Sequence, residues 1–205
     1  MKKYSSEQRG RSMIEMLGVL AIVGVLSIAG IAGYSKAMAK YKVNKLVDQV
    51  STVAANVRTT FAGQGNYKGL DEQTAYDLGI YPEEVSKDCV EVDINNTNAD
   101  CLHNSFGGQL VVSCDLYDND YSFFDVAVGS LSKDACTALV MADWGPASSV
   151  VGLTKITSGY NAYDAAGDDN ELYSLSELKN SSTTIAAEVC DCGAENTCTV
   201  NWRFK

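Results

Sequence analysis

The chain has 205 residues, enough for one hydrophobic core of ordinary size plus an elongated helix. Its formal net charge of −10 is unevenly spread: residues 63–205 hold 7 Lys or Arg against 23 Asp or Glu, a net of −16, and residues 11–62 hold 6 against 2, a net of +4. Nucleic-acid binding needs a clustered basic face, so this acidic C-terminal part argues against that class of protein.

The N-terminal segment, residues 1–10, is short and basic, and it precedes a long uncharged run. It carries three Lys or Arg against one Glu and ends in Gly10. Residues 16–33 contain no charged side chain, and with the apolar pair before Glu15 they approach the roughly 20 residues of a membrane-spanning helix. Positive residues before a first apolar helix hold that end in the cytoplasm.

Proteolytic cleavage in this region would occur before the apolar helix rather than after it. A secretory signal peptide has a shorter apolar core and a small-residue cleavage site on its far side. Here the plausible cut is at Gly10–Arg11, so we expect the helix to stay in the mature protein.

Glu15 is the one carboxylate at the mouth of this helix. A charged side chain inside a membrane helix costs roughly 2.5–3.5 kcal/mol on insertion scales, and less near the interface. Glu15 therefore either lies at the level of the lipid headgroups or has a chemical function, and the adjoining processing signal favours a function.

Gly10, Glu15 and the apolar run of residues 16–33 together resemble the type IV pilins and the pseudopilins of type II secretion, over about residues 1–60. The resemblance implies that a prepilin peptidase cuts after Gly10 and methylates the new amino terminus, here Arg11. It also implies that Glu15 pairs with the terminal ammonium of a neighbouring subunit in a filament. An unpaired carboxylate in an apolar bundle is expensive, so such pairing would select the assembly register. Arg11 departs from the family, whose first mature residue is usually apolar.

The helix is predicted to continue from Tyr34 to about residue 62 with one apolar face. Apolar residues recur there at three- and four-residue steps, and Gly63 and Gly65 mark its end. The small residues Gly24, Gly30 and Gly33 are either weak points or sites of close helix packing. The apolar positions are Val43, Leu46, Val47, Val50, Val53, Ala54, Val57 and Phe61.

The remainder, residues 63–205, is predicted to be a mixed head domain, which makes the fold α+β: a long helix against an antiparallel sheet. Short helices are expected over 71–78 and from a cap at Ser130 or Ser132 to about residue 142. Strands are expected over 89–94, 109–113, 121–128 and 198–204. The stretch 147–182, rich in Ser, Gly, Asn and Asp, is predicted to be loop.

Two segments of the head resemble the type IVb branch of the pilins. Residues 103–108 (HNSFGG) are similar to that branch's asparagine–aromatic–Gly-Gly turn, and residues 133–139 (KDACTAL) with Asp143–Trp144–Gly145 are similar to its cysteine-bearing helix. In that branch this cysteine closes a C-terminal loop, which favours a long-range disulfide at Cys136.

Seven cysteines, none of them in residues 1–88, suggest disulfides in an exported head. We expect a local Cys89–Cys101 bridge and a bridge from Cys136 to one of Cys190, Cys192 or Cys198. Because the count is odd, one thiol is left over, and Cys114 is the expected residue.

No catalytic constellation is found, and we expect no enzyme activity, metal or cofactor. His103 is the single histidine, so a triad or a multi-histidine metal site is excluded. Cys190, Cys192 and Cys198 lack the paired spacing of zinc sites. The acidic runs at 115–120 and 168–171 do not match a calcium loop and are better interpreted as solvated loops.

The sequence therefore predicts the major subunit of a type IV pilus, used for adhesion, aggregation or motility. Its expected partners are copies of itself, the prepilin peptidase, the pilus assembly machinery and, before assembly, the lipid bilayer. We expect it in the inner membrane as a precursor and outside the cell as a filament. The alternatives are a minor pilin, a secretion pseudopilin or a membrane-tethered adhesin.

Overall fold

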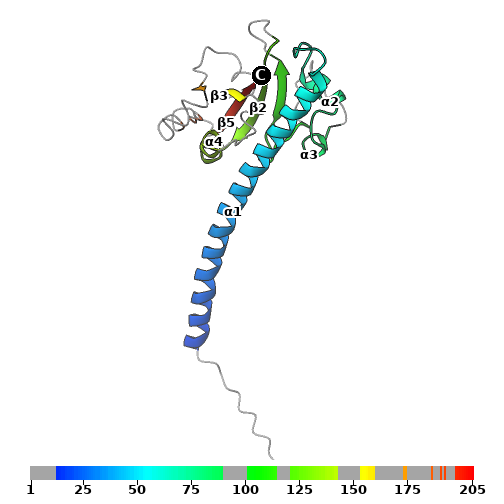
Figure 1. Ribbon diagram of the computed structural model, residues 1–205. Helices are drawn as coiled ribbons and strands as arrows, with labels where there is room; N and C mark the ends of the chain where they lie inside the picture. Colours follow the sequence, from blue (N-terminus) through cyan, green and yellow to red (C-terminus); the bar gives the residue numbers. More distant parts are fainter. Residues whose placement is uncertain are drawn as a thin grey trace, which may run out of the picture. The chain divides into compact units, whose positions relative to one another are not determined.

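The computed structural model describes residues 13–89, 101–114, 121–142, 186, 190, 192 and 197–205, together with the backbone of 153–159 and 173–174. The chain divides into two units, Met1–Tyr41 and Lys42–Lys205. Helix α1, Met13–Phe61, runs through the boundary as one continuous helix (Figure 1). We call the second unit the head.

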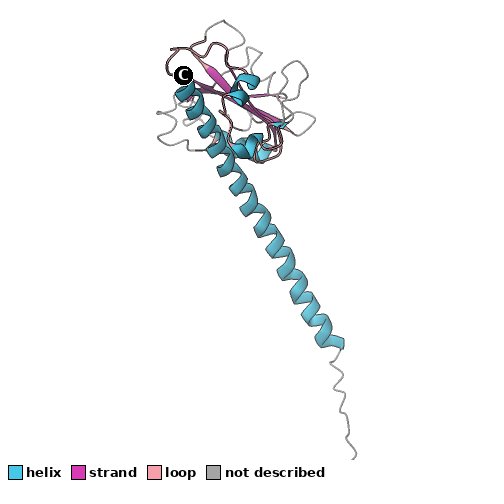
Figure 2. Ribbon diagram, turned by 90° about the vertical axis from the view of Figure 1, so that its right-hand side faces the viewer, coloured by secondary structure: helices cyan, strands magenta, loops and turns pink. Residues whose placement is uncertain are grey.

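The head part of α1 is amphipathic, as the periodicity of its sequence predicts. Its buried residues recur at helical spacing, and Val43 and Val47 are half-buried against the same core. Figures 1 and 2 show this part of the helix beside the sheet. The fully buried face consists of Leu46, Gln49, Val50, Val53, Ala54, Val57 and Phe61.

Two short helices follow α1, and the first of them was predicted from the sequence. Helix α2, Glu72–Asp77, is capped by Asp71, whose carboxylate accepts a hydrogen bond from the backbone N–H of Thr74 at 2.7 Å. Helix α3, Glu83–Ser86, follows Pro82. Ile80 and Val85 from this segment enter the core beside α1.

The sheet has five strands in the order β1-β2-β5-β3-β4, and every pairing is antiparallel. The strands are β1 Leu110–Cys114, β2 Phe124–Leu131, β3 Leu153–Gly159, β4 Tyr173–Ser174 and β5 Cys198–Phe204. The α+β fold, with a long helix against an antiparallel sheet, is therefore confirmed.

The loop prediction for residues 147–182 is wrong in part. Strand β3 pairs with β5 along most of its length, and β4 pairs with β3 at Lys155–Ser174 and Ile156–Tyr173. Although the stretch is rich in Ser, Gly, Asn and Asp as a whole, β3 contains the β-branched residues Thr154, Ile156 and Thr157, which favour a strand. The strand expected over 89–94 lies, after Cys89, outside the described residues.

Both faces of the central strands are buried. Phe124, Val126 and Val128 of β2 face the α1 core, and Phe124 stacks on Phe204 with ring centroids 5.2 Å apart. On the opposite face, Asp125 receives two hydrogen bonds from the Arg203 guanidinium, both of 2.9 Å. Such a bidentate pair satisfies a carboxylate that is almost fully buried.

Helix α4, Lys133–Val140, follows β2 and begins at one of the two predicted caps. Ser132 is the cap, since its hydroxyl accepts a hydrogen bond from the N–H of Ala135 at 3.3 Å. Ser130 lies in the strand instead, with a φ of 60°, near a register shift between Val128 and Leu131. The cap places Cys136 on the buried side of α4.

Candidate functional site

The first half of α1 carries a continuous apolar surface. Among the described residues, α1 is the one helix long and apolar enough to cross a membrane, and none of its most apolar stretch is buried. Exposed fractions of its large apolar side chains run from 51% to 82%. An apolar surface of this extent marks contact with lipid or with other chains. It comprises Met13, Ile14, Met16, Leu17, Val19, Leu20, Ile22, Val23, Val25, Leu26, Ile28, Ile31 and Tyr34.

The polar side chains on this surface are satisfied within the helix. Ser27 donates its hydroxyl to the carbonyl of Val23 at 2.7 Å, and Ser35 donates to Ile31 at 3.0 Å. A hydroxyl bonded to the preceding turn can enter an apolar environment at low cost. This surface can therefore contact lipid, and it can pack against α1 of another copy.

Glu15 is exposed in the first turn of α1, on the helix that carries the apolar surface. A negative charge at this end is favoured by the helix dipole, typically by 0.3–1 kcal/mol. That gain is smaller than the cost of burying an unpaired carboxylate in an apolar bundle. Gly10 and Arg11, the predicted cleavage and methylation residues, lie outside the described residues.

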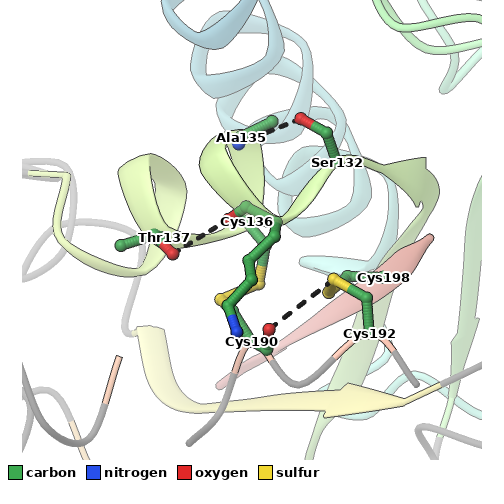
Figure 3. The surroundings of a disulfide bond; sticks show 8 residues. Ser132, Ala135, Cys136, Thr137, Cys190, Cys192 and Cys198 are labelled. Carbon is green, nitrogen blue, oxygen red and sulfur yellow. Dashed lines mark hydrogen bonds between the residues drawn. A yellow bond between two sulfur atoms is a disulfide. The ribbon is translucent and has the colours of Figure 1, made fainter. Parts of the chain in front are cut away.

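Three disulfides close loops of the head. Cys89 joins Cys101, the local pairing expected from the sequence. Cys136 joins Cys190, which selects one of the three partners that the sequence left open. The third bridge, Cys192–Cys198, was not predicted from the sequence. Figure 3 shows it near the Cys136–Cys190 bridge, beside α4 and β5.

Cys114 is the free cysteine, at the end of β1 and half-buried against the core. The zinc arrangement considered for Cys190, Cys192 and Cys198 does not form, because each of these sulfurs is in a disulfide. Within the described part of the chain no cluster of His, Cys, Asp or Glu is arranged for a metal. The acidic runs 115–120 and 168–171 lie outside it.

The turn over residues 103–108 is held by one buried amide. Asn104 accepts hydrogen bonds from the N–H groups of Phe106 and Gly108 and donates to the carbonyls of Gln109 and Gly129. Gly108 has no room for a side chain, since a Cβ there would lie 2.2 Å from the Gly129 carbonyl oxygen. The Asn–x–aromatic–Gly–Gly sequence thus packs the turn against β2.

A cavity of about 530 Å³ beside this turn was missed by sequence reasoning. Its lining comes from α1, from α3 and the residues just after it, and from the turn itself, which are far apart in the sequence. The one signal was the cluster of lysines along α1, at Lys36, Lys40, Lys42 and Lys45. The lining residues are Lys42, Lys45, Gln49, Glu84, Lys87, Asp88, His103, Asn104, Ser105, Phe106 and Gly107.

The family model for bundlin matches residues 36–205. The chain belongs to the bundlin family of type IV pilins. This membership supports a role as a pilus subunit, a structural rather than an enzymatic role. It also fits a membrane-anchored precursor and an extracellular pilus, because the apolar half of α1 has the length and composition of an anchor.

Two solved structures of pilins are similar to the chain. TcpA, a type IV pilin from Vibrio cholerae El Tor biotype, has 18% identity and a TM-score of 0.51, with 80% of this chain and 98% of TcpA covered. A type IV b pilin from Salmonella typhi has 18% identity and a TM-score of 0.48, with 79% of this chain and 97% of that chain covered. No curated protein sequence matches the chain.

Proposed function

We propose that this bundlin-family chain is the major subunit of a type IV pilus and polymerises through the first half of α1. The observation that supports the proposal most directly is the wholly exposed apolar surface on a chain whose head matches a pilin family. In the bilayer this surface contacts lipid. In a filament the same surface packs against other copies of α1, where van der Waals packing supplies the attraction.

In this proposal residues 1–10 are a leader, 11–62 the polymerisation helix, whose second half packs in the head, and 63–205 the globular remainder of the head. A prepilin peptidase removes the leader after Gly10 and methylates Arg11. The precursor spans the inner membrane with its N-terminus in the cytoplasm, and assembly machinery in that membrane extracts it. Three Lys or Arg in the leader against one Glu support this orientation.

Glu15 has the role of fixing the register between subunits. Its carboxylate pairs with the new terminal ammonium of a neighbour and is thereby compensated in an apolar bundle. Removing one partner of a buried ion pair costs about 3–5 kcal/mol. The pair therefore discriminates strongly against filaments in which the helices are shifted along one another.

The role in a filament is tested by shearing cells and identifying the chains in the released fibres. The proposal expects this chain to be the most abundant protein of the fibres. A trace amount would assign it instead to the minor pilins, and its complete absence from surface fibres would contradict the proposal.

The role of Glu15 is tested with Glu15→Ala and a control, Asp48→Ala, which removes an exposed carboxylate from the head part of α1. Glu15→Ala should leave a normal amount of protein in the membrane and reduce sheared filaments by about a hundredfold, as the loss of a buried partner predicts. Asp48→Ala should assemble like the wild type. Normal filaments from Glu15→Ala would refute the pairing.

A further inference from the structure

The cavity beside the 103–107 turn has walls that are fixed to one another by buried polar contacts. Gln49 of α1 is 3% exposed, donates to Glu84 at 3.0 Å and accepts from the backbone N–H of Ser105 at 3.0 Å. The hydroxyl of Ser105 donates to the carbonyl of Lys42 at 2.8 Å. Helix α1, helix α3 and the turn are therefore joined, and the cavity is pre-formed.

Three lysines and two acids line this cavity. Lys45 pairs with Glu84 at 3.1 Å, and the ammonium of Lys42 lies 5.6 Å from the centroid of the Phe106 ring. Lys87 and Asp88 are exposed at the rim. With His103 neutral the lining carries 3 − 2 = +1, on a head sequence whose residues 63–205 carry −16.

Acidic heads in a filament repel one another, and a local positive site on each head can offset this repulsion. Heads of like charge repel one another when they are closer than the screening length, about 8 Å at physiological salt. Contact between them is favourable only where positive and negative patches meet. The cavity, which Lys42, Lys45 and Gln49 of α1 help to line, offers such a positive patch on the head.

We infer that this cavity is a subunit–subunit contact, in which Lys42, Lys45 and Lys87 receive one or more carboxylates from the head of a neighbouring copy. The inference rests on the proposed polymerisation and specifies a partner for it. The half-buried lysines keep their charges close to an incoming carboxylate, while Gln49 and Asn104 hold the walls. The preference is for an acidic protein segment, because the head supplies 23 acids per copy over residues 63–205.

The direct test is carbodiimide cross-linking of filaments assembled from a mixture of isotope-labelled and unlabelled chains. Carbodiimide joins an amine to a carboxylate only when the two are in contact, and mixed-label peptides identify bonds between copies. We expect Lys42, Lys45 or Lys87 to be linked to an Asp or Glu of another copy. Bonds confined to Glu84 or Asp88 of the same chain would overturn the inference.

Matched charge reversals provide a second test. Lys42→Glu/Lys87→Glu should lower filament yield at least roughly tenfold, because like charges in a contact cost more than the ~1.4 kcal/mol of a tenfold change. The control is Lys68→Glu/Lys133→Glu, a pair of exposed head lysines outside the cavity, and it should assemble normally. Equal yields from both double variants would refute the inference.

Two further readouts separate this contact from other occupants and from failure of the proposed function. Protection of the cavity lysines from acetylation in the membrane-resident precursor would indicate an anionic lipid and overturn the inference. Protection of these lysines in filaments, absent from the membrane-resident precursor and lost again when the filaments are disassembled, would support it. If wild-type filaments lack the chain altogether, the proposed function fails; if they contain it and the lysines stay fully reactive, only the contact fails.

Discussion

Asn104 makes four hydrogen bonds through a side chain that is 5% exposed. They bind the 103–108 turn at both ends, at distances between 2.7 and 3.3 Å. Two of the bonds reach backbone carbonyls, at Gln109 just before β1 and at Gly129 in β2. A single amide therefore connects the turn to the sheet and shapes one wall of the cavity.

Replacing Asn104 by Ala should destabilise the head by about 2–4 kcal/mol, because several buried backbone groups lose their partner at once. The measurement is urea unfolding of the full chain in detergent, followed by fluorescence of its tryptophans, of which Trp202 is fully buried. Asn66→Ala is the control. It removes a similar turn bond to Lys68 at an exposed position and should cost less than about 1 kcal/mol.

The disulfides should contribute according to the lengths of chain that they close. Removing Cys136–Cys190, which closes 54 residues, should cost about 4 kcal/mol, and removing Cys192–Cys198, which closes 6, about 2 kcal/mol. Double Cys→Ser variants unfolded in urea measure both values. Cys114→Ser, which breaks no bridge, should change the unfolding free energy by about 1 kcal/mol or less. Equal costs for the two bridges would contradict the chain-entropy argument.

At the scale of elements, β1 is an edge strand whose outward N–H groups are occupied. The N–H groups of Leu110 and Cys114 donate to the carbonyls of Leu102 and Leu70, and the N–H of Val112 donates to the hydroxyl of Tyr81 at 3.1 Å. An open edge would invite pairing with another chain. These bonds occupy the outward N–H groups of β1 and so disfavour strand addition at this edge.

Tyr81→Phe should destabilise the head by about 1–3 kcal/mol, because it leaves the N–H of Val112 buried without an acceptor. Hydrogen exchange at Val112 should accelerate relative to Val126 on the paired strand. Tyr41→Phe, at a side chain that is 59% exposed, serves as the control and should leave both measurements unchanged. An unaltered exchange rate at Val112 in Tyr81→Phe would show that the hydroxyl is dispensable.

Local patterns predicted the elements that carry their own signals. The apolar periodicity of residues 43–61 and the glycines after it indicate where α1 is buried and where it ends, and the last strand has the predicted bounds of 198–204. Ser132 was recognisable as a cap because its side chain acts on the adjacent turn, whereas Asp71, which the sequence placed inside a helix over 71–78, is the cap of α2. These features depend on neighbours within a few residues.

Features that depend on distant partners could not be predicted in the same way. Strand β3 pairs with β5, and β4 pairs with β3. The strand propensity of a segment does not indicate its pairing partner. Strand β2 begins at Phe124 rather than residue 121, since the carbonyl of Tyr121 accepts from the N–H of Tyr67. The choice of Cys190 for Cys136, and the cavity, likewise depend on the folded arrangement.

At the scale of the whole molecule, the composition divides the chain into an apolar N-terminal part and an acidic C-terminal part. Residues 16–33 are uncharged and apolar, which suits both a bilayer and a helical bundle, whereas residues 63–205 carry a net charge of −16 and suit water. An acidic head keeps the surface of a filament soluble, but it opposes close packing of the heads. Register at Glu15 and charge complementarity at the lysine-lined cavity are the two proposed means of overcoming that opposition.

Because ions screen both the repulsion between acidic heads and the attraction at the cavity, filament stability should depend on salt differently in two variants. Moderate salt relieves head repulsion in both, but in the wild type it also weakens the attraction at the cavity, so Lys42→Glu/Lys87→Glu filaments should gain more stability from salt than wild-type filaments. Turbidity or sedimentation of sheared filaments across a salt series measures both. The same salt response in both would place the cavity away from subunit contacts.

The central claim is that the chain is processed after Gly10 and polymerised through α1. Its most direct test is intact mass and N-terminal sequencing of the protein in sheared surface filaments. The account predicts a chain that begins at a methylated Arg11 and carries three disulfides and one free thiol, at Cys114. A filament protein that still carries residues 1–10, or filaments from which the chain is missing, would contradict it.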